Sequence, residues 1–371
     1  MSTRKRLHIA LIFGGRSGEH EVSLMSARSV LSVLDPAKYE VTQIGITVSG
    51  QWLTGEDVIG KFESGKTLGL EPALVLPDPS ESGLHVLRKG QLEKLAEVDV
   101  FFPLLHGTFG EDGTIQGLFE MANAAYVGAG VLGSSVGMDK GLFKDVMRAN
   151  GVPSVETMLV LRAELEKDME SVIRRAEAMS PYPLFTKPAN LGSSVGITKC
   201  RSRSDLHEGL MDASLYDRRI LIERGVANAR EIEVSVLGND DPRASVPGEV
   251  LPSREFYSYE SKYIDGTSGL LIPAPIPAEV AAKVQELAVR AFKAVDASGM
   301  ARVDFFLDRD TNELYLNELN TIPGFTKISM YPKLWEASDI PYAALVDRLI
   351  DLALQRKTER DRTSHSYRSG A

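Results

Sequence analysis

Cysteine is almost absent from this 371-residue chain, which contains only Cys200. One cysteine excludes an internal disulfide, and with it the class of small disulfide-stabilised secreted proteins. The chain also lacks a secretory h-region and any run of 18 apolar residues, so the sequence predicts no membrane-spanning helix. We therefore expect a cytoplasmic protein in which Cys200 is an inert thiol.

Positive charge is also scarce. Lysine and arginine number 42 against 51 aspartate and glutamate residues, so the net charge is -9. This balance argues against a partner that needs a broad basic surface, and we expect no nucleic-acid binding. The chain is 43% hydrophobic and 25% charged, which is typical of a globular enzyme. Its length predicts two or three domains.

The segment 302–320 has the pattern of a β-hairpin. Two apolar runs, 302–307 and 313–320, flank the polar turn 308–312. Side chains alternate along a strand, so Arg302 and Asp304 share one face. If the two strands pair, Glu318 and Asn320 converge beside them.

Such a cluster of oxygen ligands suits Mg²⁺, which prefers carboxylates together with phosphate oxygens. The alternative is an ordinary solvated face of the hairpin. The turn Pro323-Gly324 directly after the second strand favours a site, because it can direct backbone N–H groups toward the same place.

The N-terminal part resembles an open parallel sheet. Residues 7–13 and 98–105 are apolar runs, and each is followed by a glycine-rich turn and then a helix. Ligands of such sheets bind at the carboxyl ends of the strands, where both turns lie. His106 begins the second turn, where it either lines a site or fixes the loop by hydrogen bonds. The fold class predicted is mixed α/β and α+β.

The first glycine-rich turn, 14–23, invites a dinucleotide-binding interpretation. The G-x-G-x-x-G spacing is absent, and the next strand, 40–48, ends without an acidic residue for a ribose. Glu19 and Glu21 either match the dipole of the following helix or hold a substrate amine. Residues 49–98 are predicted to be a β-rich insertion without visible chemistry.

Lysines and a flexible loop occupy the middle of the chain. Lys140 and Lys144 are four residues apart on a predicted helix, where a solvated pair is the usual interpretation. Lys187 ends a strand, and the loop 189–197 after it is rich in glycine and serine. Such a loop can fold over phosphates with Lys187 supplying charge, although it lacks the P-loop pattern and is otherwise an ordinary turn.

Several features lie near the predicted hairpin. The strand 230–237 places Glu231 and Glu233 on one face, either solvated or binding a ribose. The long segment 252–270 without periodicity predicts a mobile active-site flap. A last helix is expected over 342–356, and a disordered tail over 357–371.

These motifs together closely resemble the D-alanine–D-alanine ligase family of ATP-grasp enzymes. The matching segments span almost the whole ordered chain and are 14–23, 106–113, 138–140, 187–196, 262–263, 302–304 and 317–324. Each motif alone is modest, and their occurrence in this order is specific.

The resemblance implies an ATP-grasp fold preceded by a Rossmann-like domain. We expect an N-terminal domain over 1–133 that includes the insertion 49–98, a central subdomain over 134–224 and a C-terminal subdomain over 225–356. ATP would lie between the last two. A homodimer formed through the N-terminal domain is also implied.

The resemblance further implies two Mg²⁺ ions, with Mn²⁺ as a substitute, held by Asp304, Glu318 and Asn320. The nucleotide would be contacted by a second set of residues: Lys140, Lys187 and Lys262 at the phosphates, Glu223 at the adenine amino group and Glu231 at the ribose. Arg224 stands where the family often has a lysine.

For the substrates, the resemblance implies that Arg302 and the Gly324 N–H stabilise the oxyanion. Glu19 would anchor the first ammonium group and form a hydrogen-bonded set with Ser193 and Tyr263. The remaining expected substrate contacts are Ser329, with Lys262, at the second carboxylate, and His106 and Met330 in the substrate site.

The activity implied is ATP-dependent joining of two D-alanine molecules through a D-alanyl phosphate, for peptidoglycan synthesis. Tyr263 indicates an amine acceptor, since a phenylalanine there accompanies hydroxy-acid acceptors in the family. Other hypotheses are a different ATP-grasp ligase or a D-alanine–D-lactate ligase, a nucleotide-binding module without catalysis, and a nicotinamide-dependent oxidoreductase.

Overall fold

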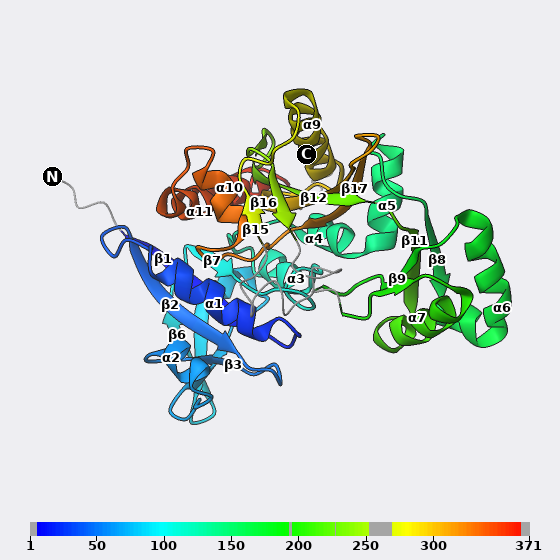
Figure 1. The fold of residues 1–371 in the computed structure, drawn as a ribbon. Coiled ribbons are helices and arrows are strands. Elements are labelled where there is room, and N and C mark those ends of the chain that lie inside the picture. Colours follow the sequence, from blue (N-terminus) through cyan, green and yellow to red (C-terminus); the bar gives the residue numbers. More distant parts are fainter. Residues whose placement is uncertain (1–5, 193–194, 227, 252–268, 365–371) are drawn as a thin grey trace, which may run out of the picture.

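Figure 1 shows the fold as a computed structural model, which describes residues 6–192, 195–226, 228–251 and 269–364. Three sheets follow one another along the chain. The first and second lie on opposite sides of the molecule in Figure 1, and the third lies above and between them. In the described ranges, no helix is long and apolar enough to cross a membrane.

The N-terminal sheet has seven strands in the order β6-β5-β4-β3-β2-β1-β7. Only β1 with β2 and β1 with β7 pair in parallel. The strands are β1 Leu7–Gly14, β2 Tyr39–Ile46, β3 Trp52–Thr54, β4 Glu71–Leu74, β5 Leu84–Arg88, β6 Gln91–Ala96 and β7 Val100–Pro103. The helices of this part are α1 His20–Leu31, α2 Val58–Glu63, α3 Thr114–Met121 and the 3-10 turn Pro79–Glu81.

The apolar run predicted as the first strand forms β1 at the centre of this sheet, and Ile9 to Phe13 are fully buried. A central parallel strand is covered on both faces, which is why its sequence does not alternate. Gly14 ends β1 with a φ of +87°, and a Cβ there would lie 2.2 Å from the Ile46 carbonyl oxygen. Only glycine allows the chain to turn here toward α1.

The segment 49–98 contains β3 to β6, as expected of a β-rich insertion, and also the unexpected helix α2. Residues 125–128 form no strand, and a single isolated bridge joins Tyr126 to Phe101 of β7.

The central sheet has four strands in the order β10-β9-β11-β8. Its strands are β8 Thr157–Leu161, β9 Leu184–Pro188, β10 Thr198–Cys200 and β11 Arg219–Arg224. The helices of this part are α4 Val131–Met138, α5 Lys140–Ala149, α6 Arg162–Met179 and α7 Arg203–Tyr216. Cys200 is buried in this core, and burial raises the pKa of its thiol to about 11. This fits the inert thiol predicted.

The C-terminal sheet orders its strands β15-β14-β12-β16-β17, and β13 pairs with β12. Its strands are β12 Ala229–Gly238, β13 Arg243–Ala244, β14 Gly248–Leu251, β15 Gly269–Leu271, β16 Gly299–Asp308 and β17 Leu314–Asn320. The helices are α9 Ala278–Ala294, α10 Met330–Glu336 and α11 Tyr342–Arg360. The predicted hairpin is confirmed as β16 and β17, which pair antiparallel.

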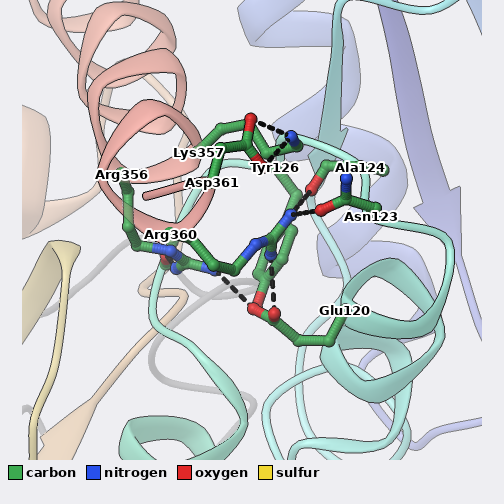
Figure 2. Close-up of polar contacts among 9 residues, drawn as sticks. Glu120, Asn123, Ala124, Tyr126, Arg356, Lys357, Arg360 and Asp361 are labelled. Atoms are coloured by element: carbon green, nitrogen blue, oxygen red, sulfur yellow. Dashed lines mark hydrogen bonds and ion pairs between the residues drawn. The ribbon is translucent and has the colours of Figure 1, made fainter. Parts of the chain in front are cut away.

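Helix α11 lies against the N-terminal sheet. The expectation that a disordered tail begins at Lys357 is wrong, because Lys357 lies within this helix. The helix continues to Arg360. Arg360 and Arg356 both contact the carboxylate of Glu120 at the end of α3, at 2.6 and 3.2 Å. Arg356 also lies over the ring of Tyr126, as Figure 2 shows. These contacts explain why the last turns of α11 remain helical.

Candidate active site

The β16–β17 hairpin brings the polar side chains expected at its face together. In the register, Arg302 lies opposite Asn320 and Asp304 opposite Glu318. The Arg302 guanidinium donates to both oxygens of Asp304 at 2.7 Å, and Asn320 Nδ2 donates to Asp304 Oδ2 at 3.1 Å. The alternative of a solvated face is wrong, because the Arg302 and Asp304 side chains are only 13% exposed.

A third carboxylate, from Glu233 on β12, completes this cluster. Glu233 lies directly across the strand pair from Asp304, and Glu233 Oε2 is 3.0 Å from Arg302 Nε. From the sequence, Glu233 is expected only to be solvated or to bind a ribose. The pairing of β12 with β16 decides its neighbours, and no local pattern in either strand indicates that pairing.

A buried ion cluster lies on the opposite side, where the central sheet faces the hairpin. Glu223 on β11 contacts Lys187 Nζ at 2.5 Å and Lys144 Nζ at 3.4 Å. Burial alone would raise the pKa of Glu223, but the two lysines outweigh it and lower that pKa to about 2. Lys144 is 1% exposed, so the solvated pair with Lys140 is wrong for this lysine. Lys140 Nζ donates to the Leu191 carbonyl at 2.6 Å.

The N-terminal part of the chain supplies the third wall through the turn after β7. Glu111 accepts hydrogen bonds from the Gly107 N–H at 2.8 Å and from the Ile322 N–H at 2.9 Å. His106 Nδ1 lies 2.8 Å from the Ile322 carbonyl oxygen and Nε2 lies 3.0 Å from Ser26 Oγ. His106 therefore fixes the loop by hydrogen bonds and also borders the site, so both interpretations hold in part.

Glu111 is a further candidate for a functional residue, and from the sequence it stands out only as part of the segment 106–113. Burial, and then the charge of Glu19, raise the pKa of Glu111 to about 8. The signal that could have found it is a second acid in a glycine-rich turn at the end of a buried strand.

Glu19 lies where two glycine loops meet. A Cβ on Gly107 would be 2.6 Å from Glu19 Oε2, and a Cβ on Gly192 would be 2.8 Å from the same oxygen. The carboxylate of the N-terminal domain is therefore in close contact with the loop that follows β9. Glycine permits this approach at both positions.

One cavity of 590 Å³ connects these groups. Of the predicted site residues, the following line it: Glu19, His106, Lys140, Lys187, Glu223, Glu231, Arg302, Asp304, Glu318, Asn320 and Gly324. Glu111 and Glu233 also line it. Ser193, Lys262 and Tyr263, together with most of the flap expected at 252–270, lie outside the described residues.

Two predicted substrate residues do not line this cavity. Met330 is buried and packs with Val250 and Leu334 in a small hydrophobic cluster. Ser329 precedes α10, and its Oγ lies 2.7 Å from Thr326 Oγ1 and accepts from the Thr326 N–H. Arg224 stacks over the Tyr315 ring at 5.0 Å and pairs with Glu156.

Two family models match the chain. The model described as the D-Ala D-Ala ligase N-terminus matches residues 8–129, and that of the D-Ala D-Ala ligase C-terminus matches residues 146–351. The chain belongs to the D-alanine–D-alanine ligase family. It is therefore an ATP-dependent ligase acting on small molecules, and its divalent-metal requirement follows from the family.

Relatives of this ligase family resemble the chain along its whole length. A D-alanine–D-alanine ligase from Heliobacterium modesticaldum is 52% identical over 96% of this chain and 97% of its own. One from Natranaerobius thermophilus is 47% identical over 98% of this chain and 99% of its own.

Among solved structures, the D-alanine–D-alanine ligase of Coxiella burnetii is similar with a TM-score of 0.82 and 35% identity, covering 97% of both chains. The VanG D-Ala:D-Ser ligase of Enterococcus faecalis is similar with a TM-score of 0.84 and 35% identity, covering 94% of this chain and 100% of that one. The predicted ATP-grasp fold is thereby confirmed.

The donor set of this ligase fits a hard divalent cation. Asp304 and Glu318 offer carboxylate oxygens, and Asn320 offers an amide oxygen because its Nδ2 donates to Asp304. Within 6–192, 195–226, 228–251 and 269–364, no three His, Cys, Asp or Glu side chains could hold a metal by themselves. A cation held by Asp304, Glu318 and Asn320 would fill its remaining coordination positions with other ligands. Mg²⁺ usually does so with water and substrate phosphates.

Proposed function

We propose that this chain joins two D-alanine molecules to D-alanyl-D-alanine, at the expense of ATP, for peptidoglycan precursor synthesis. The observation that supports this most directly is the meeting of three walls in one cavity. Lysines line one wall, the arginine–carboxylate cluster the second, and Glu19 of the N-terminal domain the third. Phosphoryl transfer to a carboxylate requires that combination of cations and a binding group for an ammonium.

In the first step, the carboxylate of the first D-alanine attacks the γ-phosphate of ATP, giving D-alanyl phosphate and ADP. Lys140 and Lys187 reduce the repulsion between the two anions, with Lys262 from the flap as a third cation. Mg²⁺, or Mn²⁺ in its place, would be held by Asp304, Glu318 and Asn320, and two such ions would neutralise phosphate charge when bound. Glu223 and Glu231 would receive the adenine amino group and the ribose.

In the second step, the amine of the second D-alanine attacks the acyl carbon and phosphate leaves. The oxyanion would accept from Arg302 and the Gly324 N–H. Asp304 and Glu233 hold that guanidinium in one orientation, so the donors need no rearrangement during the reaction.

The two amino acids would be held from several sides. Glu19 anchors the first ammonium and joins Ser193 and Tyr263 in orienting the second amine. His106 and Met330 are proposed to shape the substrate site, His106 from the cavity wall and Met330 from its cluster with Val250 and Leu334. Ser329 is proposed to receive the second carboxylate.

The division into domains, the oligomeric state and the cellular location also belong to this proposal. We propose three parts, at 1–133, 134–224 and 225–356. We also propose a homodimer through the N-terminal part and a cytoplasmic location, which fit an enzyme that makes soluble cell-wall precursors. Analytical ultracentrifugation at micromolar concentration tests the dimer.

A different acceptor is the second candidate function, because the VanG D-Ala:D-Ser ligase shares the fold at 35% identity. The curated relatives near 50% identity are named D-alanine–D-alanine ligases, which favours D-alanine. Incubation with ATP, Mg²⁺ and an equimolar mixture of D-alanine, D-serine, D-lactate and L-alanine tests both, with products identified by mass spectrometry. We expect D-alanyl-D-alanine to predominate. A predominant mixed or L-containing product would contradict the proposal.

A further inference from the structure

Lys144 is a buried lysine with no part in the reaction proposed above. It lies on α5 with 1% of its side chain exposed. Lys144 is not among the residues that line the 590 Å³ cavity. Its ammonium makes two contacts, a hydrogen bond to the Leu316 carbonyl at 3.0 Å and an ion pair with Glu223 Oε1 at 3.4 Å. A lysine is seldom buried this completely unless its charge has a specific partner.

The partner carboxylate belongs to Glu223, and one of its oxygens is available to a molecule in the cavity. Glu223 lines the cavity and is 2% exposed. Its Oε2 pairs with Lys187, whereas within the described part of the chain Oε1 accepts no hydrogen bond. Phe185 lies opposite Glu223 in the β9–β11 pair, and Ile197, Phe306 and Leu319 are further apolar residues that line the same cavity. An apolar slot that contains an anionic acceptor suits a flat ring that carries an amino group.

Lys187 does not contact the Glu223 carboxylate exclusively. It also lies 3.4 Å from Asn317 Oδ1, and in the proposed function its charge also serves the phosphates of ATP. Without a second cation, Glu223 would then be a buried and uncompensated charge. Lys144 remains in place, because Leu316 is itself held by a hydrogen bond from its N–H to the Pro153 carbonyl at 2.7 Å.

We propose that Lys144 is a positioning residue for nucleotide selection: it holds Glu223 Oε1 ionised and oriented toward the 6-position of the purine. The site thereby distinguishes a 6-amino from a 6-oxo purine. A 6-oxo group presents an acceptor to the carboxylate and leaves it unsatisfied, which is more unfavourable than the mere loss of one hydrogen bond. This inference rests on the proposed function, because it assumes that the base of ATP occupies this slot.

Binding of ADP and IDP by calorimetry, in the presence of Mg²⁺, tests the inference without turnover. We expect the wild-type chain to bind ADP at least about tenfold more tightly than IDP, the value of one hydrogen bond to a charged group. In Lys144→Met, ADP affinity should fall by about tenfold while IDP affinity changes little, so the ratio approaches one. Lys144→Arg should restore most of the ratio.

Arg148→Met is the matched control, because Arg148 lies one turn further along α5 on the surface and pairs only with Asp145 among the described residues. Its ADP-to-IDP ratio should equal that of the wild type. If Lys144→Met weakens both nucleotides equally, or neither, Lys144 has a purely structural role and the inference is wrong.

A second variant covers the case in which Lys144→Met does not fold. Lys144→Gln keeps a donor for the Leu316 carbonyl but lacks the charge that faces Glu223, and the same loss of discrimination is expected. An unchanged ratio in this variant would overturn the inference. Failure of the wild-type chain to ligate D-alanine, with discrimination intact, would instead count against the proposed function alone.

Discussion

At the scale of single residues, the contact between Gly192 and Glu19 links the loop after β9 to the N-terminal domain. In Gly192→Ala the new Cβ would meet Glu19 Oε2 at 2.8 Å, so the carboxylate must move. Because that atom ends a flexible side chain, stability should change little. Misplacing a binding group by about 1 Å can reduce catalysis about a hundredfold. We therefore expect kcat/KM for D-alanine to fall by about ten- to a hundredfold in steady-state assays.

Gly18→Ala is the control for this substitution. A Cβ on Gly18 meets no atom within 4 Å, and the residue precedes Glu19 directly. Its kinetics should match the wild type. If Gly192→Ala were as active as the wild type, the exact position of the Glu19 carboxylate would not matter for catalysis.

The buried carboxyl of Glu111 predicts a pH dependence of stability. Its pKa is raised to about 8, first by burial and then by Glu19, from an ordinary value near 4.5. The folded state therefore binds the proton more tightly than the unfolded state. Its contribution to stability is fully present below about pH 4.5 and is lost as the pH rises toward 8, by roughly 5 kcal/mol at most.

Urea unfolding of the wild type and of Glu111→Gln between pH 5 and 8.5 measures this effect. The wild-type free energy of unfolding should fall more steeply with pH than that of the variant. Parallel curves would show that Glu111 titrates as it does in the unfolded chain.

Some neighbours in the candidate site could be predicted from the sequence, and others could not. Arg302 and Asp304 could be placed on one face because they are two residues apart on one strand. The contact of Lys144 with Glu223 joins residues from separate elements, and only the packing of α5 against the sheets brings them together. Helical spacing with Lys140 suggests a solvated pair, whereas Lys144 is buried and donates to the Leu316 carbonyl.

At the scale of elements, the register of β12, β16 and β17 determines the anionic cluster. Glu233 and Glu318 flank Asp304 from the two neighbouring strands. Glu233→Gln removes one of the two carboxylates that hold Arg302 but leaves the Asp304 contact. We expect kcat to fall by about tenfold, with KM for ATP unchanged, because the oxyanion donor loses part of its preorganisation.

Glu249→Gln is the matched control in the same sheet. Glu249 is equally buried and pairs with Arg230 at 2.6 Å, and it does not line the cavity. Its substitution should lower the thermal unfolding temperature without lowering kcat. Equal kinetic losses in both variants would mean that Glu233 acts only through stability.

Elements with a strong pattern were predictable, and those held by tertiary contacts were not. The hairpin has alternating strands and a polar turn. Helix α4 was missed because two glycines interrupt its sequence. Packing requires the glycine at 133, because a Cβ there would lie 2.8 Å from the Asp296 carbonyl oxygen, and this contact outweighs helix propensity.

At the scale of the whole molecule, the two ends of the chain share one hydrophobic core. Ile9 and Phe102 of the N-terminal sheet belong to the same buried cluster as Leu345 and Leu349 of α11. The N-terminal and C-terminal parts should therefore unfold together. Sequence patterns predicted each part separately but contain no signal for this long-range packing.

The arginine contacts at the end of α11 provide the test of that coupling. Glu120 accepts from Arg360 at 2.6 Å, and the Glu120 and Arg360 side chains are 31% and 19% exposed. Partial burial and the additional Arg360 bond to the Ala124 carbonyl at 2.8 Å favour a real contribution. A double-mutant cycle of Glu120→Gln and Arg360→Met should give a coupling of about 1 kcal/mol in urea unfolding.

The comparison is the exposed pair of Glu359, in the last turn of α11, with Arg362, which follows the helix. Its side chains are 74% and 62% exposed, and water screens such pairs, so its cycle should give a coupling near zero. In every variant, fluorescence and circular dichroism should report one shared transition. Two separate transitions, or equal coupling in both cycles, would show that α11 does not join the two ends of the chain, since the buried contact would then contribute no more than a solvated one.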